Sequence, residues 1–141
     1  MAPYVNTFLP ELEKISQEHA SFDLILDTLI ILRRLLKTND PSCMIYYSEN
    51  YQKIHDIINR GLSHEYAKVV SEALRVAGVF VNVLKSPSGT LDPKYTSVAQ
   101  PLYASIRAKL QKADIDQEIK QCSIIAMANF LAVCHKNLND Q

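Results

Sequence analysis

Three 13-residue stretches of the chain repeat one pattern of large and small apolar residues: LILDTLIILRRLL at 24–36, VVSEALRVAGVFV at 69–81 and IKQCSIIAMANFL at 119–131. The second stretch starts 45 residues after the first, and the third starts 50 residues after the second. Each begins with an apolar residue, has a small residue four positions later, and has further apolar residues at +5, +8 and +12. Such spacing places all five positions on one side of an α-helix. We therefore expect three equivalent helices.

The small residue in each stretch allows a neighbouring helix to approach closely, where a larger side chain would hold it away. One third of the chain is about 47 residues, and HEAT and armadillo repeats, which are helical hairpins, span roughly 40–47 residues. The sequence therefore predicts an all-α solenoid of HEAT repeats, with about three antiparallel helix pairs in a right-handed stack. A plain six-helix bundle is the alternative. The aligned columns are Leu24, Val69 and Ile119; Thr28, Ala73 and Ser123; Leu29, Leu74 and Ile124; Leu32, Ala77 and Met127; and Leu36, Val81 and Leu131.

Turn-forming residues are scarce, because the chain has only three glycines and six prolines, and this favours long helices over an all-β fold. Candidate helix N-caps are Asp40, Ser63 and either Asp114 or Asp116. Pro10 and Pro101 must each lie in a first turn or cause a kink, since proline removes a helical hydrogen bond. The expected helices are Val5–Gln17, Ser21–Thr38, Pro41–Arg60, Ser63–Lys85, Pro93–Gln111 and Ile115–Asn137, which group into repeats at 4–38, 41–85 and 93–137.

The ends of the chain lack the polar outer face that terminal repeats of a solenoid normally carry. Phe8 and Leu9 lie near the start, and Phe130, Leu131 and Val133 lie near the end. We therefore expect the whole chain, 1–141, to be a single HEAT-repeat segment from a longer array.

Composition limits the classes of partner. The 15 Lys and Arg residues balance the 15 Asp and Glu residues, which argues against a nucleic-acid or anionic-membrane surface. The start Met1-Ala2-Pro3-Tyr4 does not resemble a signal peptide, and the apolar stretch 24–36 is too short to span a membrane. Three cysteines, an odd number, fit a reducing compartment. We expect a soluble intracellular protein, cytoplasmic and/or nuclear.

No arrangement of residues suggests catalysis. The four histidines lack the spacing of metal ligands, and the three glycines are isolated, so no phosphate-binding loop is present. Cys122 and Cys134 have the apolar surroundings of buried small residues, and Cys43 has no paired base. We expect no enzyme activity, no cofactor, no metal and no small-molecule substrate.

The segment KLQKADIDQEIK at 109–120 resembles a stretch of the cullin-associated, neddylation-dissociated proteins, which are long HEAT-repeat regulators of cullin–RING ubiquitin ligases. The segment YAKVVSEAL at 66–74 resembles the equivalent hairpin of the preceding repeat in that family. With Leu24, Asp27 and Leu29, the resemblance covers most of the chain from Phe8 to Asp140, and it is that of an internal segment of the family's amino-terminal half.

This resemblance implies a non-catalytic role. Members of the family wrap around a cullin that lacks its ubiquitin-like modifier, and they exclude or exchange the substrate-receptor module. The implied partners are a cullin and its RING subunit, and the implied role is to sequester unmodified cullin–RING complexes and promote receptor exchange. The alternative is a HEAT- or armadillo-type adaptor of another class, such as a nuclear transport receptor or a phosphatase scaffold, because all these proteins share the generic spacing.

Candidate contact residues follow from the same offsets. In such repeats the second helix of each pair lines the concave face, which is the usual platform for partners. Charged and apolar residues alternate along this face, as in a protein-binding groove, whereas a phosphate-binding track would repeat Lys or Arg. The alternative is a solvated face with ion pairs between repeats, such as Asp23 with Lys68. The candidate protein-binding residues are Asp27, Arg34, Lys68, Glu72, Arg75, Glu118 and Asn129.

Overall fold

The computed structural model describes residues 10, 11, 14, 21–37, 49–84, 93–112 and 116–138, the side chains of 93 and 134–138 apart. Within these ranges the chain is helical and has no strand. The elements are α2 (Phe22–Leu36), α4 (Tyr51–Leu62), α5 (Ala67–Val83), η1 (Pro93–Tyr95), α6 (Thr96–Leu110) and α7 (Gln117–Leu138). None of these helices is long and apolar enough to cross a membrane.

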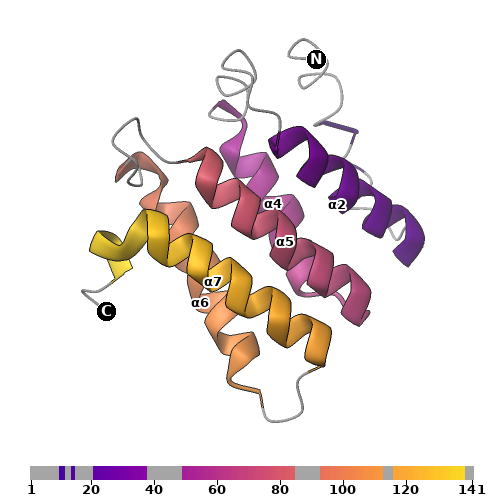
Figure 1. The fold of residues 1–141 in the computed structure, drawn as a ribbon. Coiled ribbons are helices and arrows are strands. Elements are labelled where there is room, and N and C mark those ends of the chain that lie inside the picture. Colours follow the sequence, from indigo (N-terminus) through magenta and orange to yellow (C-terminus); the bar gives the residue numbers. More distant parts are fainter. Residues whose placement is uncertain are drawn as a thin grey trace.

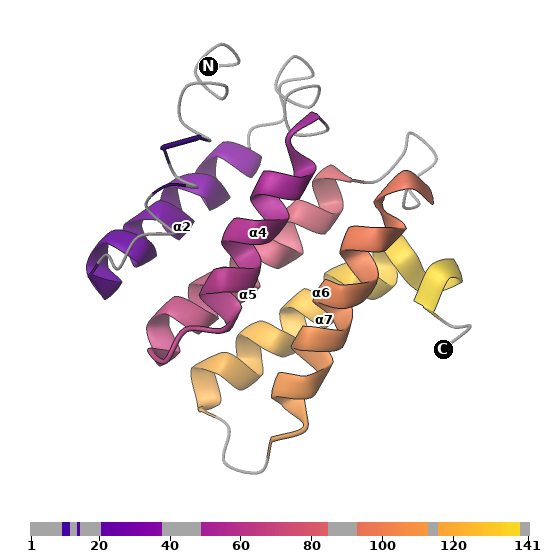
Figure 2. The same cartoon turned by 180° about the vertical axis from the view of Figure 1, so that it is seen from behind.

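The helices form two layers. Helices α2, α5 and α7 lie side by side in one layer (Figure 1), and α4 and α6 form the layer behind it (Figure 2). Helix α4 packs on α5 and α6 packs on α7, so each makes a hairpin, and α5 also contacts both α2 and α7. The predicted all-α stack of helix pairs is confirmed. The expected first helix, Val5–Gln17, lies outside the described residues except at three positions.

The column of small residues is buried throughout. Thr28, Ala73 and Ser123 are each at most 2% exposed, and they lie on the three helices of the first layer. The Thr28 hydroxyl donates a hydrogen bond to the Leu24 carbonyl at 2.8 Å, so its burial leaves no unpaired polar group. Ala73 lies against Gly61 of α4, and Thr28 lines a small cavity together with Gly61. The predicted close approach of a neighbouring helix is confirmed at these two positions, and that neighbour is α4 in the other layer.

The large apolar columns are only partly buried. Leu24 at one edge of the layer is 52% exposed, and Ile124 and Leu131 at the other edge are 52% and 41% exposed. Helix α7 instead buries Phe130, one position before Leu131, and Cys122, two positions before Ile124. The expected alignment is wrong here because α2 and α7 each have a first-layer neighbour on one flank within the described structure, whereas α5 has one on both.

The helix ends correct several expected boundaries. Asp116 caps α7 as predicted, because its Oδ1 accepts hydrogen bonds from the backbone N–H groups of Glu118 and Ile119 at 2.9 and 3.3 Å. Ser63 does not cap α5. It ends α4, where its hydroxyl donates to the Asn59 carbonyl at 3.1 Å. The other candidate caps, Asp40 and Asp114, lie outside the described residues.

Other differences are small or concern proline. Pro101 lies beyond the first turn of α6, so the first-turn alternative is wrong, and the helix continues past the missing N–H. Helix α5 begins at Ala67, four residues later than expected, and the expected helix at 93–111 divides into η1 and α6. The expected start of the third helix, at Pro41, lies outside the described residues.

Gly61 sets the distance between the two layers at the end of α4. A Cβ atom at this position would lie 2.9 Å from the Cβ of Ala73 and 3.2 Å from the Cδ1 of Leu29. The Leu29 methyl group can shift slightly, but the 2.9 Å contact is not tolerated, and the Ala73 Cβ cannot move without moving the backbone of α5. A residue without a side chain is therefore needed where α4 approaches α5.

We expect Gly61→Ala to lower the free energy of unfolding by about 1–2 kcal/mol, measured by urea denaturation. Alanine raises helix propensity by about 1 kcal/mol over glycine. Overpacking costs roughly 1–3 kcal/mol, and the 2.9 Å contact with Ala73 places the cost in the upper part of that range. Asn59→Ala, at an exposed position of the same helix, is the matched control and should be neutral or slightly stabilising. A Gly61→Ala protein as stable as this control would contradict the packing argument.

His55 makes stability depend on pH. Burial lowers the pKa of His55 below its ordinary 6.5, against the opposing effect of Asp56, and its Nδ1 atom has no hydrogen-bond partner among the residues that the structure describes. The unfolded chain therefore binds a proton at His55 more readily than the folded chain does, and stability falls as pH drops below about 6.5. We expect the free energy of unfolding, measured by urea denaturation, to decrease less in the His55→Gln protein than in the unchanged protein when the pH is lowered from about 7 to 5.5. Equal losses in the two proteins would rule out His55 as a source of the dependence.

Candidate protein-binding groove

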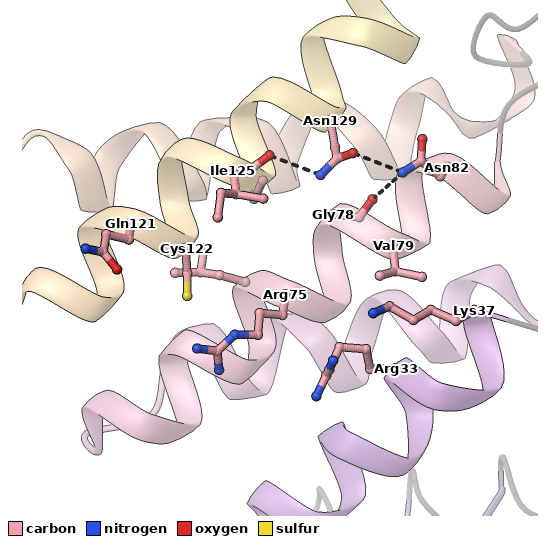
Figure 3. Close-up of a pocket in the computed structure, with 12 residues that line it drawn as sticks. Arg33, Lys37, Arg75, Gly78, Val79, Asn82, Gln121, Cys122, Ile125 and Asn129 are labelled. Atoms are coloured by element: carbon pink, nitrogen blue, oxygen red, sulfur yellow. Dashed lines mark hydrogen bonds between the residues drawn. The ribbon is translucent and has the colours of Figure 1, made fainter.

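The layer of α2, α5 and α7 contains a pocket of about 420 Å³, which we call the central groove (Figure 3). Helix α5 runs along the middle, and α2 and α7 flank it, so three segments far apart in the sequence meet at one surface. The groove is lined by Arg33, Lys37, Leu74, Arg75, Gly78, Val79, Asn82, Gln121, Cys122, Ile125, Ala126 and Asn129.

A buried carboxylate organises one end of the groove. Glu72 on α5 is buried and accepts hydrogen bonds from Arg33 Nε on α2 and from Arg75 Nη1, the latter at 3.1 Å. Arg75 Nη2 donates to Glu118 on α7 at 2.8 Å, and this bond raises the pKa of Arg75 above its usual value. The four charged side chains therefore join all three helices of the first layer. Because a buried charge is costly unless it is paired, this network also fixes how the helices are aligned.

Two asparagine side chains join α5 to α7 further along the groove. Asn82 Nδ2 donates to the Gly78 carbonyl at 3.2 Å and to Asn129 Oδ1 at 3.1 Å, and Asn129 Nδ2 donates to the Ile125 carbonyl at 3.1 Å (Figure 3). A Cβ atom on Gly78 would lie 3.1 Å from Asn129 Nδ2. Glycine at this position therefore leaves room for the amide of Asn129.

Apolar side chains also line the groove, beside the exposed Gln121. Ile125 is 63% exposed, Val79 is half-buried, and Cys122 is buried beside them. Burial raises the pKa of the Cys122 thiol, although the nearby Arg75 opposes the shift, and a protonated thiol is a poor nucleophile. Among the residues that the structure describes, no three His, Cys, Asp or Glu side chains gather as metal ligands would. The groove thus presents cations, amides and aliphatic side chains, which suit binding of a polypeptide.

The candidate residues divide into three groups. Arg75 and Asn129 line the groove. Glu72 and Glu118 bind Arg75 and so act on the groove indirectly. The exposed residues outside its lining are Asp27, Arg34 and Lys68. Whether any of the seven contacts a partner stays a prediction.

The ion pair of Asp23 with Lys68, which the alternative of a solvated face suggested, is absent from the described residues. Adjacent helices are instead joined by Arg33 with Glu72 and by Arg75 with Glu118. Ion pairs therefore do link neighbouring helices of the first layer, but between other residues than those the offsets suggested.

Sequence analysis missed Arg33, Lys37 and Asn82. Offsets of 45 and 50 residues relate equivalent positions, whereas the touching residues Asn82 and Asn129 are 47 apart. Side chains that meet between adjacent helices lie on opposite flanks of those helices, so they are not equivalent positions. The spacing of Arg75, Gly78 and Asn82, three and then four residues, is the signal that could have placed Asn82 on the groove.

We expect Glu72→Gln to lower the free energy of unfolding by roughly 2 kcal/mol, by thermal or urea denaturation, because it leaves two guanidinium groups facing a neutral amide. The effect is smaller than the roughly 3–5 kcal/mol of a fully buried pair, since the Arg75 side chain is 40% exposed. Glu118→Gln, whose side chain is 45% exposed, is the control and should cost less than about 1 kcal/mol. Equal losses at the two positions would show that burial of Glu72 is not what matters.

The family described as "CAND1-like, TPR repeats" matches residues 1–127 of this chain. TPR stands for tetratricopeptide repeat, a helical hairpin of roughly 34 residues. The offsets of 45 and 50 residues between equivalent helices of this chain are longer, so its hairpins are closer in length to HEAT repeats, although the family description names TPR repeats.

Two curated relatives are similar to most of the chain. "Cullin-associated NEDD8-dissociated protein 1" of Arabidopsis thaliana is 24% identical over 128 residues, which are 90% of this chain and 10% of the relative. The protein of the same name from Dictyostelium discoideum is 26% identical over 119 residues, which are 84% of this chain and 9% of the relative. The chain thus spans about a tenth of these relatives, and no solved structure matches it. Because the family match covers nearly the whole chain, the resemblance seen in the sequence is confirmed, and the chain belongs to the CAND1-like repeat family.

Proposed function

We propose that this chain is part of a non-catalytic scaffold that binds a cullin and its RING subunit. The observation that carries the proposal is the family match over residues 1–127. Both curated relatives carry names that describe them as cullin-associated. The layer of α2, α5 and α7, with its central groove, is the surface we assign to the partner. The family match disfavours the alternative of a transport receptor or phosphatase scaffold.

The finer role is to hold cullin–RING complexes that lack the ubiquitin-like modifier and to promote exchange of the substrate receptor. Because the chain spans about a tenth of its relatives, we assign that activity to a longer protein and assign to this chain one part of the binding surface. The place of action is the cytoplasm and/or the nucleus.

A pull-down with an immobilised, unmodified cullin–RING complex tests the proposal in the full-length protein. We expect Arg34→Glu combined with Arg75→Glu to weaken binding at least tenfold, because both side chains lie on or beside the proposed contact face. Lys53→Glu on α4, in the other layer, makes the same type of charge change and should bind as the unchanged protein does.

Because Glu at position 75 would face Glu72, the fold of the variant is checked by circular dichroism, and Arg75→Leu serves as a second variant without the repulsion. Undiminished binding by the folded variants would remove this face from the contact. Failure of the unchanged full-length protein to retain the complex would overturn the proposed function.

A further inference from the structure

We propose that the central groove binds an extended, acidic segment of a partner protein, with carboxylates at Lys37 and Arg33 and with the main chain at Asn82 and Asn129. The identity of the partner rests on the proposed function, but the chemistry of the bound segment follows from the groove itself.

The charged residues that line the groove are all cationic, although the chain as a whole has no net charge: Arg33, Lys37 and Arg75. Arg33 uses its Nε for the buried Glu72, and its two Nη groups make no hydrogen bond within the described residues. Lys37 is exposed, and no carboxylate of the described residues lies within ion-pair distance of its ammonium group. The groove therefore has cationic donors left for carboxylates of a partner.

The asparagine pair has hydrogen-bonding capacity left for a peptide main chain. Asn82 Nδ2 uses both of its N–H groups, while Asn82 Oδ1 accepts no hydrogen bond from the described residues. Asn129 Nδ2 uses one N–H for the Ile125 carbonyl and keeps the other. The spare acceptor and the spare donor lie at opposite ends of the hydrogen-bonded pair, where they can bind an N–H and a C=O of a peptide main chain (Figure 3).

This pairing requires an extended segment. In an α-helix the main-chain N–H and C=O groups are already bonded to each other, so a bound helix could not use the asparagine pair. Between the cations and the amides, Val79 and the 63%-exposed Ile125 offer an apolar contact. The expected segment thus has an aliphatic residue flanked by Asp or Glu.

A peptide fits the groove better than a nucleic acid does. Glu72 pairs with both Arg33 and Arg75, and Glu118 pairs with Arg75, so two of the three positive charges are already balanced by carboxylates and Lys37 alone is not. A phosphate track would instead need a series of unneutralised cations. Binding of an oligonucleotide is therefore one of the outcomes that the experiment separates.

Fluorescence anisotropy of the 141-residue chain with labelled synthetic peptides tests the inference. The probes are the acidic peptide Asp-Glu-Leu-Glu-Asp, its neutral counterpart Asn-Gln-Leu-Gln-Asn and a twelve-nucleotide oligo-dT. We expect the acidic peptide to bind at least tenfold more tightly than the neutral one, and its affinity to fall as salt is raised. Equal affinity for the two peptides, or tighter binding of the oligonucleotide, would overturn the inference.

Variants separate the two parts of the groove. Lys37→Glu should weaken the acidic peptide at least fivefold and leave the neutral one unchanged, whereas Asn82→Ala should weaken both peptides by a similar factor. Lys53→Glu, in the other layer, is the matched control and should bind as the unchanged chain does. A Lys37→Glu effect no larger than that of Lys53→Glu would also count against the groove.

Lys37→Glu, introduced into the full-length protein and tested in the pull-down, distinguishes this inference from the proposed function. If Lys37→Glu retains the cullin–RING complex as well as the unchanged protein does, the groove is not the contact, and the proposed function stands. If the acidic peptide binds but the cullin–RING complex does not, the proposed function fails, and the groove remains a peptide site.

Discussion

The structure depends on the burial of one helix, α5, on nearly all sides. Eleven of its 17 residues are buried, including Ser71, Glu72 and Gly78, and it contacts α2, α4 and α7. A helix enclosed in this way needs small residues where its neighbours approach most closely. Ala73 meets Gly61 of α4, and Gly78 leaves space for Asn129 of α7. The first approach holds the two layers together, and the second joins α5 to α7 within the first layer. A side chain at position 61 would separate α4 from α5.

Burial of α5 also explains why Glu72 has to be paired. An unpaired carboxylate at this depth would be strongly destabilising, so Arg33 and Arg75 are held close to it from two helices. The arginines in turn form the cationic edge of the central groove. The same interaction therefore aligns the three helices and gives the surface its charge. Arg33 lies in the last turn of α2, where a cation also interacts favourably with the helix dipole.

The candidate site could be predicted in part. Arg75 and Asn129 were identified because they lie beside the apolar stripe of their own helices, which periodicity reveals. Lys37 and Asn82 were not, since their position depends on which flank of one helix meets the next. Glu72 was expected on a surface and is buried, because the approach of α2 covers it. The position of Glu72 in the repeat predicted the correct face of α5. Whether a residue at the edge of that face reaches solvent depends on the distance between α5 and its neighbours.

The sequence by itself determined the helical class, the repetition of equivalent helices, the column of small buried residues and the family. Each of these depends on residues close together in the chain or on spacing that repeats along it, and helical periodicity records both. Only the tertiary structure decided that Ile124 and Leu131 are exposed, that Arg33 pairs with Glu72, and that Asn82 meets Asn129. These outcomes depend on the relative rotation and separation of packed helices, which are set by all their contacts together and are written in no single stretch of sequence.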